Sequence, residues 1–103
     1  MNCSRNDVVL LPIPFTDLTS RKVRPAIVVG GKGADLFLVP ITSVLANADF
    51  LLHEWRAAGL NTPSGVKAQL ATVDAKLAVK VVGQLAGDDT KVLDARLRDW
   101  LKL

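Results

Sequence analysis

The 103-residue chain has the length of a single domain, and half of its residues are hydrophobic, so it can bury a core without disulfides or bound metal. Its 13 Lys and Arg outnumber its 10 Asp and Glu, and the net charge of +3 permits contact with a polyanion such as RNA without requiring it. The single cysteine excludes an internal disulfide, and one histidine, one cysteine and one glutamate argue against a zinc cluster.

The sequence carries no signal for export or for a membrane. No charged and apolar leader precedes the first apolar run, and no apolar run approaches the length that crosses a bilayer. We therefore expect a cytoplasmic protein made of one domain over residues 1–103, with no membrane contact. The phosphate-cradling Gly-Lys-Ser/Thr loop and the dinucleotide fingerprint are also missing, so no cofactor is expected.

Three strands are predicted in the first half of the chain. Residues 8–11 are valine and leucine, and the prolines that follow cannot donate to a ladder. The polar segment 16–24 is typical of a hairpin connection to a second strand at 25–29, which the glycine-rich turn 30–33 closes. The third strand, 35–41, is apolar on both parities, so we expect it to be covered on both faces.

Three further strands are predicted in the second half. Residues 50–56 are compatible with a strand or with two helical turns, and the loop at 59–65 behind them favours the strand. Segments 66–73 and 77–85 alternate apolar and polar residues in part, and we expect them to pair through a turn at 74–76.

An amphipathic helix is predicted to close the chain. The residues at 87–90 supply N-cap chemistry, and Leu93, Leu97, Trp100 and Leu101 recur at helical spacing. Five or more short strands and one C-terminal helix indicate a mainly β fold, a small antiparallel barrel with the helix packed on its outside or end.

A few polar residues at strand ends are candidates for chemistry. Arg24 is held by the extended backbone before a proline, and its flat guanidinium fork matches phosphate oxygens. Considered alone, it is better explained as a solvated arginine at a hairpin end. Thr42 and Ser43 follow a strand, where hydroxyls often cap only the local backbone. His53 has the right intrinsic pKa for a base, but nothing in the sequence places it near Arg24.

The order of these features carries more information than any single residue. The most specific stretches are Asn6 to Leu18 (NDVVLLPIPFTDL), Lys22 to Val29 (KVRPAIVV) and Val39 to Ser43 (VPITS), and residues 63–69 and 72–74 follow more loosely. Together they resemble the PemK/MazF family of toxin endoribonucleases over nearly the whole chain.

The resemblance implies a fold and an activity. It implies a compact SH3-like antiparallel barrel with a C-terminal helix, which forms a homodimer. It implies the toxin of a type II toxin-antitoxin system in a bacterial cytoplasm, held inactive by a cognate antitoxin protein. The implied activity is cleavage of single-stranded RNA, with messenger RNA as the expected substrate. The 2′-hydroxyl of the RNA attacks the phosphodiester to leave a 2′,3′-cyclic phosphate, without a metal or cofactor.

The resemblance also assigns roles to residues. Arg24 stabilises the phosphorane-like charge or protonates the leaving oxygen, Thr42 assists at the scissile phosphate, and Asp74 matches an aspartate that some relatives use as the base. The RNA-binding residues implied are Phe15, Thr16, Arg21, Lys22, Ser43, Lys67 and Gln69.

The chain departs from the family pattern at several positions. Asn6 stands where a glycine is usual, Ala71 stands where some members have a basic residue, and the turn at 18–21 is short. These departures affect the expected substrate preference more than the fold.

Two other functions fit the same residues. A non-catalytic barrel could use Arg24 and Lys67 only to hold RNA or a protein, because related folds host unrelated functions. A degenerate toxin could be retained for its contact with the antitoxin. An assay of RNA cleavage separates both from an active endoribonuclease.

Overall fold

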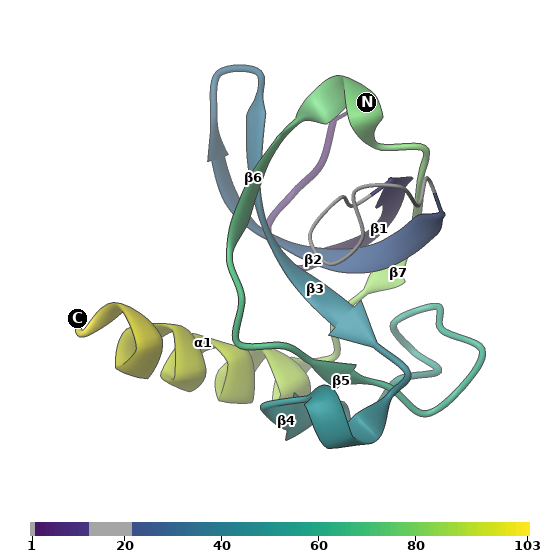
Figure 1. Cartoon of the computed structure of the whole chain (residues 1–103), viewed down its shortest axis with the longest axis vertical. Helices are drawn as coiled ribbons and strands as arrows, with labels where there is room; N and C mark the ends of the chain where they lie inside the picture. The colour runs from purple at the N-terminus through teal and green to yellow at the C-terminus, as the bar shows by residue number, and fades with distance from the viewer. Residues whose placement is uncertain (1, 13–21) are drawn as a thin grey trace.

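The structure, a computed structural model that describes residues 2–12 and 22–103, is an antiparallel sheet packed against one helix (Figure 1). Its elements, in chain order, are β1 Asp7–Pro12, β2 Val23–Lys32, β3 Asp35–Thr42, the single 3-10 turn η1 Leu45–Asn47, β4 Phe50–Leu51, β5 Gly65–Val66, β6 Ala71–Asp74, the 3-10 turn η2 Ala75–Leu77, β7 Lys80–Gln84 and α1 Gly87–Leu101. The prediction of a mainly β fold with a C-terminal helix is confirmed.

The three longest strands form the centre of the sheet. Strand β2 pairs antiparallel with β1 on one side and with β3 on the other, as the hairpin pattern predicts. β2 continues past the predicted turn, because Gly30 and Gly31 stay in the ladder after a register shift between Val28 and Gly30. The chain reverses only at Gly33, whose φ of 60° suits a residue without a side chain.

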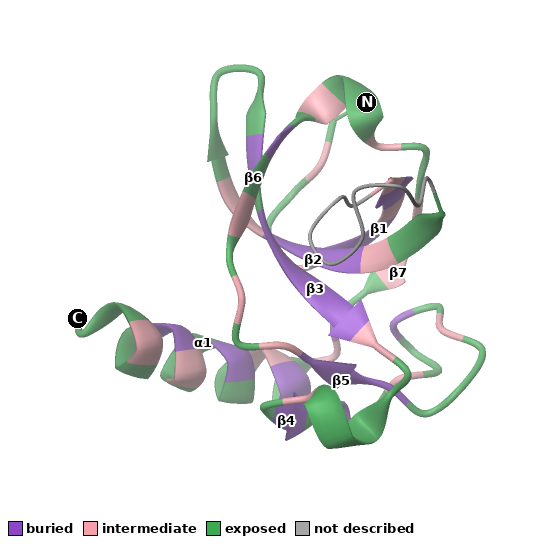
Figure 2. Cartoon of the chain, viewed as in Figure 1, coloured by how far each residue is buried: buried purple, intermediate pink, exposed green. Residues whose placement is uncertain are grey.

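Both faces of the central strands are buried (Figure 2). Neighbouring residues of a strand point to opposite faces. On β3, Val39 belongs to the core between the sheet and α1, and Leu38 belongs to a second core on the other face. On β2, Ile27 likewise belongs to the core beside α1, and Ala26 belongs to the second core. The expectation that the third strand is covered on both faces is therefore confirmed.

The sheet does not close into a barrel. Its strand order is β4-β5-β3-β2-β1-β7, and β6 pairs with β3 off this path. The predicted pairing of segments 66–73 and 77–85 is wrong, because β6 pairs with β3 and β7 pairs with β1. The first segment is also not one strand, since the chain leaves the ladder between Val66 and Ala71.

The segment predicted as a strand at 50–56 is a strand only over Phe50–Leu51. The chain then turns, with Ala58 N donating to Glu54 O at 3.3 Å and Leu60 N donating to Trp55 O at 3.1 Å. The carboxylate of Asp89 fixes the start of this turn. The prediction of a strand is wrong beyond Leu51, because a contact from a distant helix decides the backbone there.

Helix α1 lies where the pattern predicts it. Leu93 and Leu97 are buried against the sheet. The N-cap position is Ala86, which provides no side-chain cap. The predicted N-cap role of residues 87–90 is therefore wrong, because these residues lie inside the helix. Asp89 turns inward to the 53–54 backbone, and the helix ends at Lys102 in a left-handed conformation.

Candidate active site

A pocket opens where the pairing between β3 and β2 ends. β3 pairs with β2 up to Pro40, opposite Ala26, while its other edge pairs with β5 at Ile41 and Thr42. The two central strands therefore diverge at one end of the sheet. An open pocket of about 660 Å³ lies at this end. Its described lining residues are Leu10, Lys22, Arg24, Pro25, Pro40, Ile41, Thr42, Ser43, Val44, Asn47, Gly59, Leu60, Asn61, Thr62, Ser64, Lys67 and Val82.

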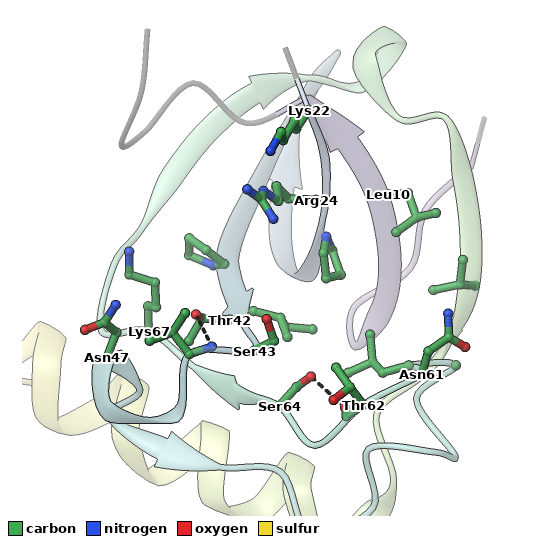
Figure 3. A pocket seen from close by; sticks show the side chains of 17 residues that line it. Leu10, Lys22, Arg24, Thr42, Ser43, Asn47, Asn61, Thr62, Ser64 and Lys67 are labelled. Atoms are coloured by element: carbon green, nitrogen blue, oxygen red, sulfur yellow. Dashed lines mark hydrogen bonds between the residues drawn. The ribbon is translucent and has the colours of Figure 1, made fainter. Parts of the chain in front are cut away.

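Cations dominate the charge of this pocket (Figure 3). Lys22 immediately precedes β2, Arg24 is the second residue of β2, and Lys67 follows β5. None of the described lining residues is an Asp, Glu or His. Arg24 is exposed, and its backbone is fixed in the ladder opposite Leu11. The pocket therefore presents positive charge on a rigid strand, with no carboxylate in its described lining, which suits a phosphate.

Two hydroxyls lie at the end of β3. Thr42 is half-buried, and its Oγ1 accepts a hydrogen bond from the Val44 backbone N–H at 3.0 Å. A hydroxyl has one donor and two acceptor sites, so this contact orients the group and leaves its proton available for a ligand. Ser43 is exposed beside it and also lines the pocket.

Asp74 lies at the other end of β3. It pairs with Asp35, at the start of the strand, whereas Thr42 is at its end. Seven residue steps of a strand separate these ends by roughly 20 Å. The Asp74 Oδ1 accepts from Lys76 N at 2.9 Å and caps the turn η2. Within one chain, Asp74 therefore does not meet a phosphate bound at Arg24 and Thr42.

The remaining candidate residues either do not line the pocket or lie outside the described residues. Gln69 is half-buried next to the pocket segment but does not line the pocket. His53 does not line it either; its side chain is 76% exposed, and its Nε2 lies 3.6 Å from Glu54 Oε1. The predicted RNA-binding residues Phe15, Thr16 and Arg21 lie outside the described residues.

Other chemical features lie away from the pocket. In residues 2–12 and 22–103, no group of three or more His, Cys, Asp or Glu could hold a metal ion. Burial, followed by repulsion from Asp7, raises the pKa of the Cys3 thiol. No helix within the described ranges has the length and apolar character needed to cross a membrane.

Comparison with known proteins identifies the family. The family model of the PemK-like, MazF-like toxin of type II toxin-antitoxin systems matches residues 4–101. The chain belongs to the PemK/MazF-like toxin family. No curated protein matches this PemK/MazF-like chain.

Solved structures show the same PemK/MazF-like fold. An endoribonuclease in complex with its cognate antitoxin from a mycobacterial species is 17% identical, with a TM-score of 0.73, over 100% of this chain and 97% of that one. The Mycobacterium tuberculosis toxin MazF-mt6 is 16% identical, with a TM-score of 0.74, over 94% of this chain and 97% of that one.

Part of the pocket of this PemK/MazF-like protein is not apparent from the sequence. Asn47, Asn61, Thr62 and Ser64 line it, and none of them belongs to the stretches that carry the resemblance most specifically. The polar composition of 59–65 predicts a loop correctly, but only the fold brings that loop to the ends of β2 and β3.

Proposed function

We propose that this protein is the toxin of a type II toxin-antitoxin system and acts as an endoribonuclease on single-stranded RNA, with messenger RNA as its substrate. One observation carries the proposal: Lys22, Arg24 and Lys67 line one open pocket together with the hydroxyls of Thr42 and Ser43. Fixed cations and hydrogen-bond donors are what phosphoryl transfer most requires. Family membership supports the same activity.

The proposed reaction needs no metal. The 2′-oxygen of the RNA attacks the adjacent phosphorus, the bond from phosphorus to the 5′-oxygen breaks, and the products are a 2′,3′-cyclic phosphate and a 5′-hydroxyl. Arg24 binds the non-bridging oxygens as they gain charge, and Thr42 donates its free proton to one of them in a hydrogen bond. The leaving 5′-oxygen takes its proton from solvent, which reaches this open pocket.

The flanking groups bind the RNA chain. Lys22 and Lys67 lie at different edges of the pocket and would contact phosphates on either side of the scissile one (Figure 3). Ser43, which lines the pocket beside Thr42, would contact the RNA there. Since the described lining residues include no carboxylate or imidazole, the proton of the 2′-hydroxyl leaves to a base that is not among them.

The proposal includes partners and a compartment. A cognate antitoxin would hold the toxin inactive in the bacterial cytoplasm. The similar mycobacterial endoribonuclease forms a complex with its own cognate antitoxin, which supports a partner of this kind. A homodimer is also proposed, and a second copy is one source of a base that the described lining residues do not supply.

The direct test is cleavage of a long single-stranded RNA by the purified protein, with and without EDTA. We expect cleavage in both conditions and new 5′-hydroxyl ends, detected by their direct labelling with a polynucleotide kinase. No cleavage at any enzyme excess would remove the enzymatic part of the proposal.

One observation favours a second candidate. The absence of a base among the described lining residues suits a module that binds RNA without cutting it. Such a module would retain the same RNA on a filter and release it intact after prolonged incubation.

Replacing Thr42 tests its hydroxyl. We expect Thr42→Val to lower kcat for RNA cleavage by about a hundredfold, since one donor to the developing charge is lost. Thr42→Ser keeps the donor and should stay within about tenfold of wild type. The Val44 N–H that loses its acceptor is exposed and can bond to water. Equal rates for Thr42→Val and wild type would exclude Thr42 from the reaction.

Replacing Asp74 tests where the base resides. We expect Asp74→Asn to leave kcat within a few-fold of wild type, because its carboxylate caps η2 far from the pocket. His53→Ala should behave in the same way, since His53 does not line the pocket. A loss comparable to that of an Arg24 variant, in either case, would assign that residue as the base. For Asp74, it would also require a contribution from a second chain.

A further inference from the structure

One wall of the pocket has a backbone that close packing and hydrogen bonds fix in place. Residues 59–62 line the pocket and are called the 59–62 wall. The wall begins at Gly59, the last residue of the turn at 53–59. Gly59 has a φ of 84°, and a Cβ there would collide with the carbonyl oxygen of Val82 on β7. Ala58, just before it, is fully buried. The wall therefore begins where two backbones are in direct contact.

Hydrogen bonds fix the rest of this wall. Leu60 N donates to Trp55 O at 3.1 Å, and the buried Ser64 donates from Oγ to Thr62 O at 2.9 Å. Ser64 is itself held by Leu52 N, which donates to its carbonyl at 2.9 Å. The backbone of the wall is thus already ordered before any ligand binds, which lowers the entropic cost of recognition.

The side chain of Asn61 is available on this ordered backbone. It is exposed, it lines the pocket, and its amide makes no hydrogen bond to a described residue. In Figure 3, Asn61 lies on one side of the pocket, and Lys67 with Asn47 lies on the other. Asn47 belongs to η1, a single turn with no buried residue, so its backbone is less well supported.

The chemistry of Asn61 differs from that of the phosphate-binding side. An amide is neutral and presents a donor and an acceptor next to each other. This arrangement matches the edge of an unpaired nucleobase, which single-stranded RNA can turn toward a protein. A phosphate can engage only the donor of the amide, whereas a base edge satisfies both of its polar atoms.

We propose that Asn61 reads the edge of the nucleobase next to the scissile phosphate and so sets the sequence that the protein cuts. The proposal rests on the proposed function. Arg24 and Thr42 hold the phosphate, and the base attached to the neighbouring ribose extends toward the 59–62 wall. Sequence specificity then comes from the Asn61 amide on the ordered loop, and catalysis comes from Arg24 on β2 and Thr42 on β3.

The experiment uses a random-sequence single-stranded RNA pool, cut by the full-length protein and sequenced at the new ends. We expect wild type to prefer one base at one position beside the cut. Asn61→Ala should lower cleavage of that preferred sequence by about 10- to 100-fold and leave other sequences nearly unchanged. Asn61→Asp replaces the donor by an acceptor and should change which base is preferred. Asn2→Ala, an exposed amide away from the pocket, is the control and should keep the wild-type profile.

A second arm tests binding separately from cleavage. The same pool with fluorine at every 2′-position has no nucleophile, so bound sequences can be recovered intact on a filter. We expect wild type to enrich the preferred base about tenfold and Asn61→Ala to lose this enrichment. Identical profiles for Asn61→Ala and wild type in the filter arm would overturn the proposal for Asn61. Absence of cleavage by wild type in the first arm would overturn the proposed function alone.

Discussion

Replacing Arg24 with alanine is expected to lower RNA cleavage at least about a hundredfold, measured as kcat/KM, without unfolding the protein. Arg24 is exposed and makes no ion pair with a described residue, so its removal leaves no buried charge unpaired. Its backbone pairing with Leu11 does not depend on the side chain. On the proposed mechanism, the interaction that is lost is the one with the reacting phosphate.

Two variants make this test specific. Lys91→Ala removes one positive charge from an exposed position of α1 and should cleave at the wild-type rate. Arg24→Lys keeps the charge but loses the two-pronged hydrogen bond, so it should recover only part of the activity. An Arg24→Ala protein with wild-type cleavage and an unchanged melting temperature would show that the pocket is not the reaction site.

Replacing Asp89 with asparagine is expected to lower the free energy of unfolding by about 2–4 kcal/mol. Asp89 is 2% exposed, and its two carboxylate oxygens accept from His53 N and Glu54 N, both at 2.9 Å. Asparagine has one acceptor oxygen, and its NH₂ group would face the second N–H. Because Asp89 lies in the first turn of α1, the change also removes a charge that the helix N-terminus favours.

Asp88→Asn is the matched control, measured by urea unfolding alongside Asp89→Asn. Asp88 lies in the same first turn but is exposed, so its replacement removes a similar charge and no buried hydrogen bond. We expect it to cost less than about 1 kcal/mol. Equal losses for the two variants would mean that the helix charge, and not the contact with the 53–54 turn, gives Asp89 its effect.

The first half of the fold can be predicted from the sequence because local signals agree there. Apolar runs locate β1, β2 and β3, although β2 extends through Gly30 and Gly31, and the apolar spacing of Leu93 and Leu97 marks α1. The candidate site residues Arg24 and Thr42 are suggested by the order of motifs, and the end of the β2–β3 pairing at Pro40 explains why they line one pocket.

The second half cannot be predicted in the same way because its strands are very short. β4 and β5 have two residues each, too few for an alternation to be recognised, and the run at 66–73 contains the ends of two strands that pair at different places on β3. The neighbouring sequence also gives no sign of the contact that Asp89 makes with the 53–54 backbone. An aspartate in a first helical turn is typical of a cap, and only the folded chain brings the 53–54 backbone to it.

The contact between the 53–59 turn and β7 allows the stability of the protein and the RNA sequence it is proposed to cut to change independently. At this crossing, Gly59 meets Val82, and Gly83 meets Ala58, so closely that neither glycine has room for a side chain. Substitution of either glycine would disturb the backbone contact between the turn and β7. Asn61 and Thr62, two and three residues after Gly59, are exposed, and their side chains can be exchanged without moving this crossing. On the proposed role of Asn61, a lineage with this architecture acquires a new target sequence by single changes at the loop surface, and its stability is inherited unchanged.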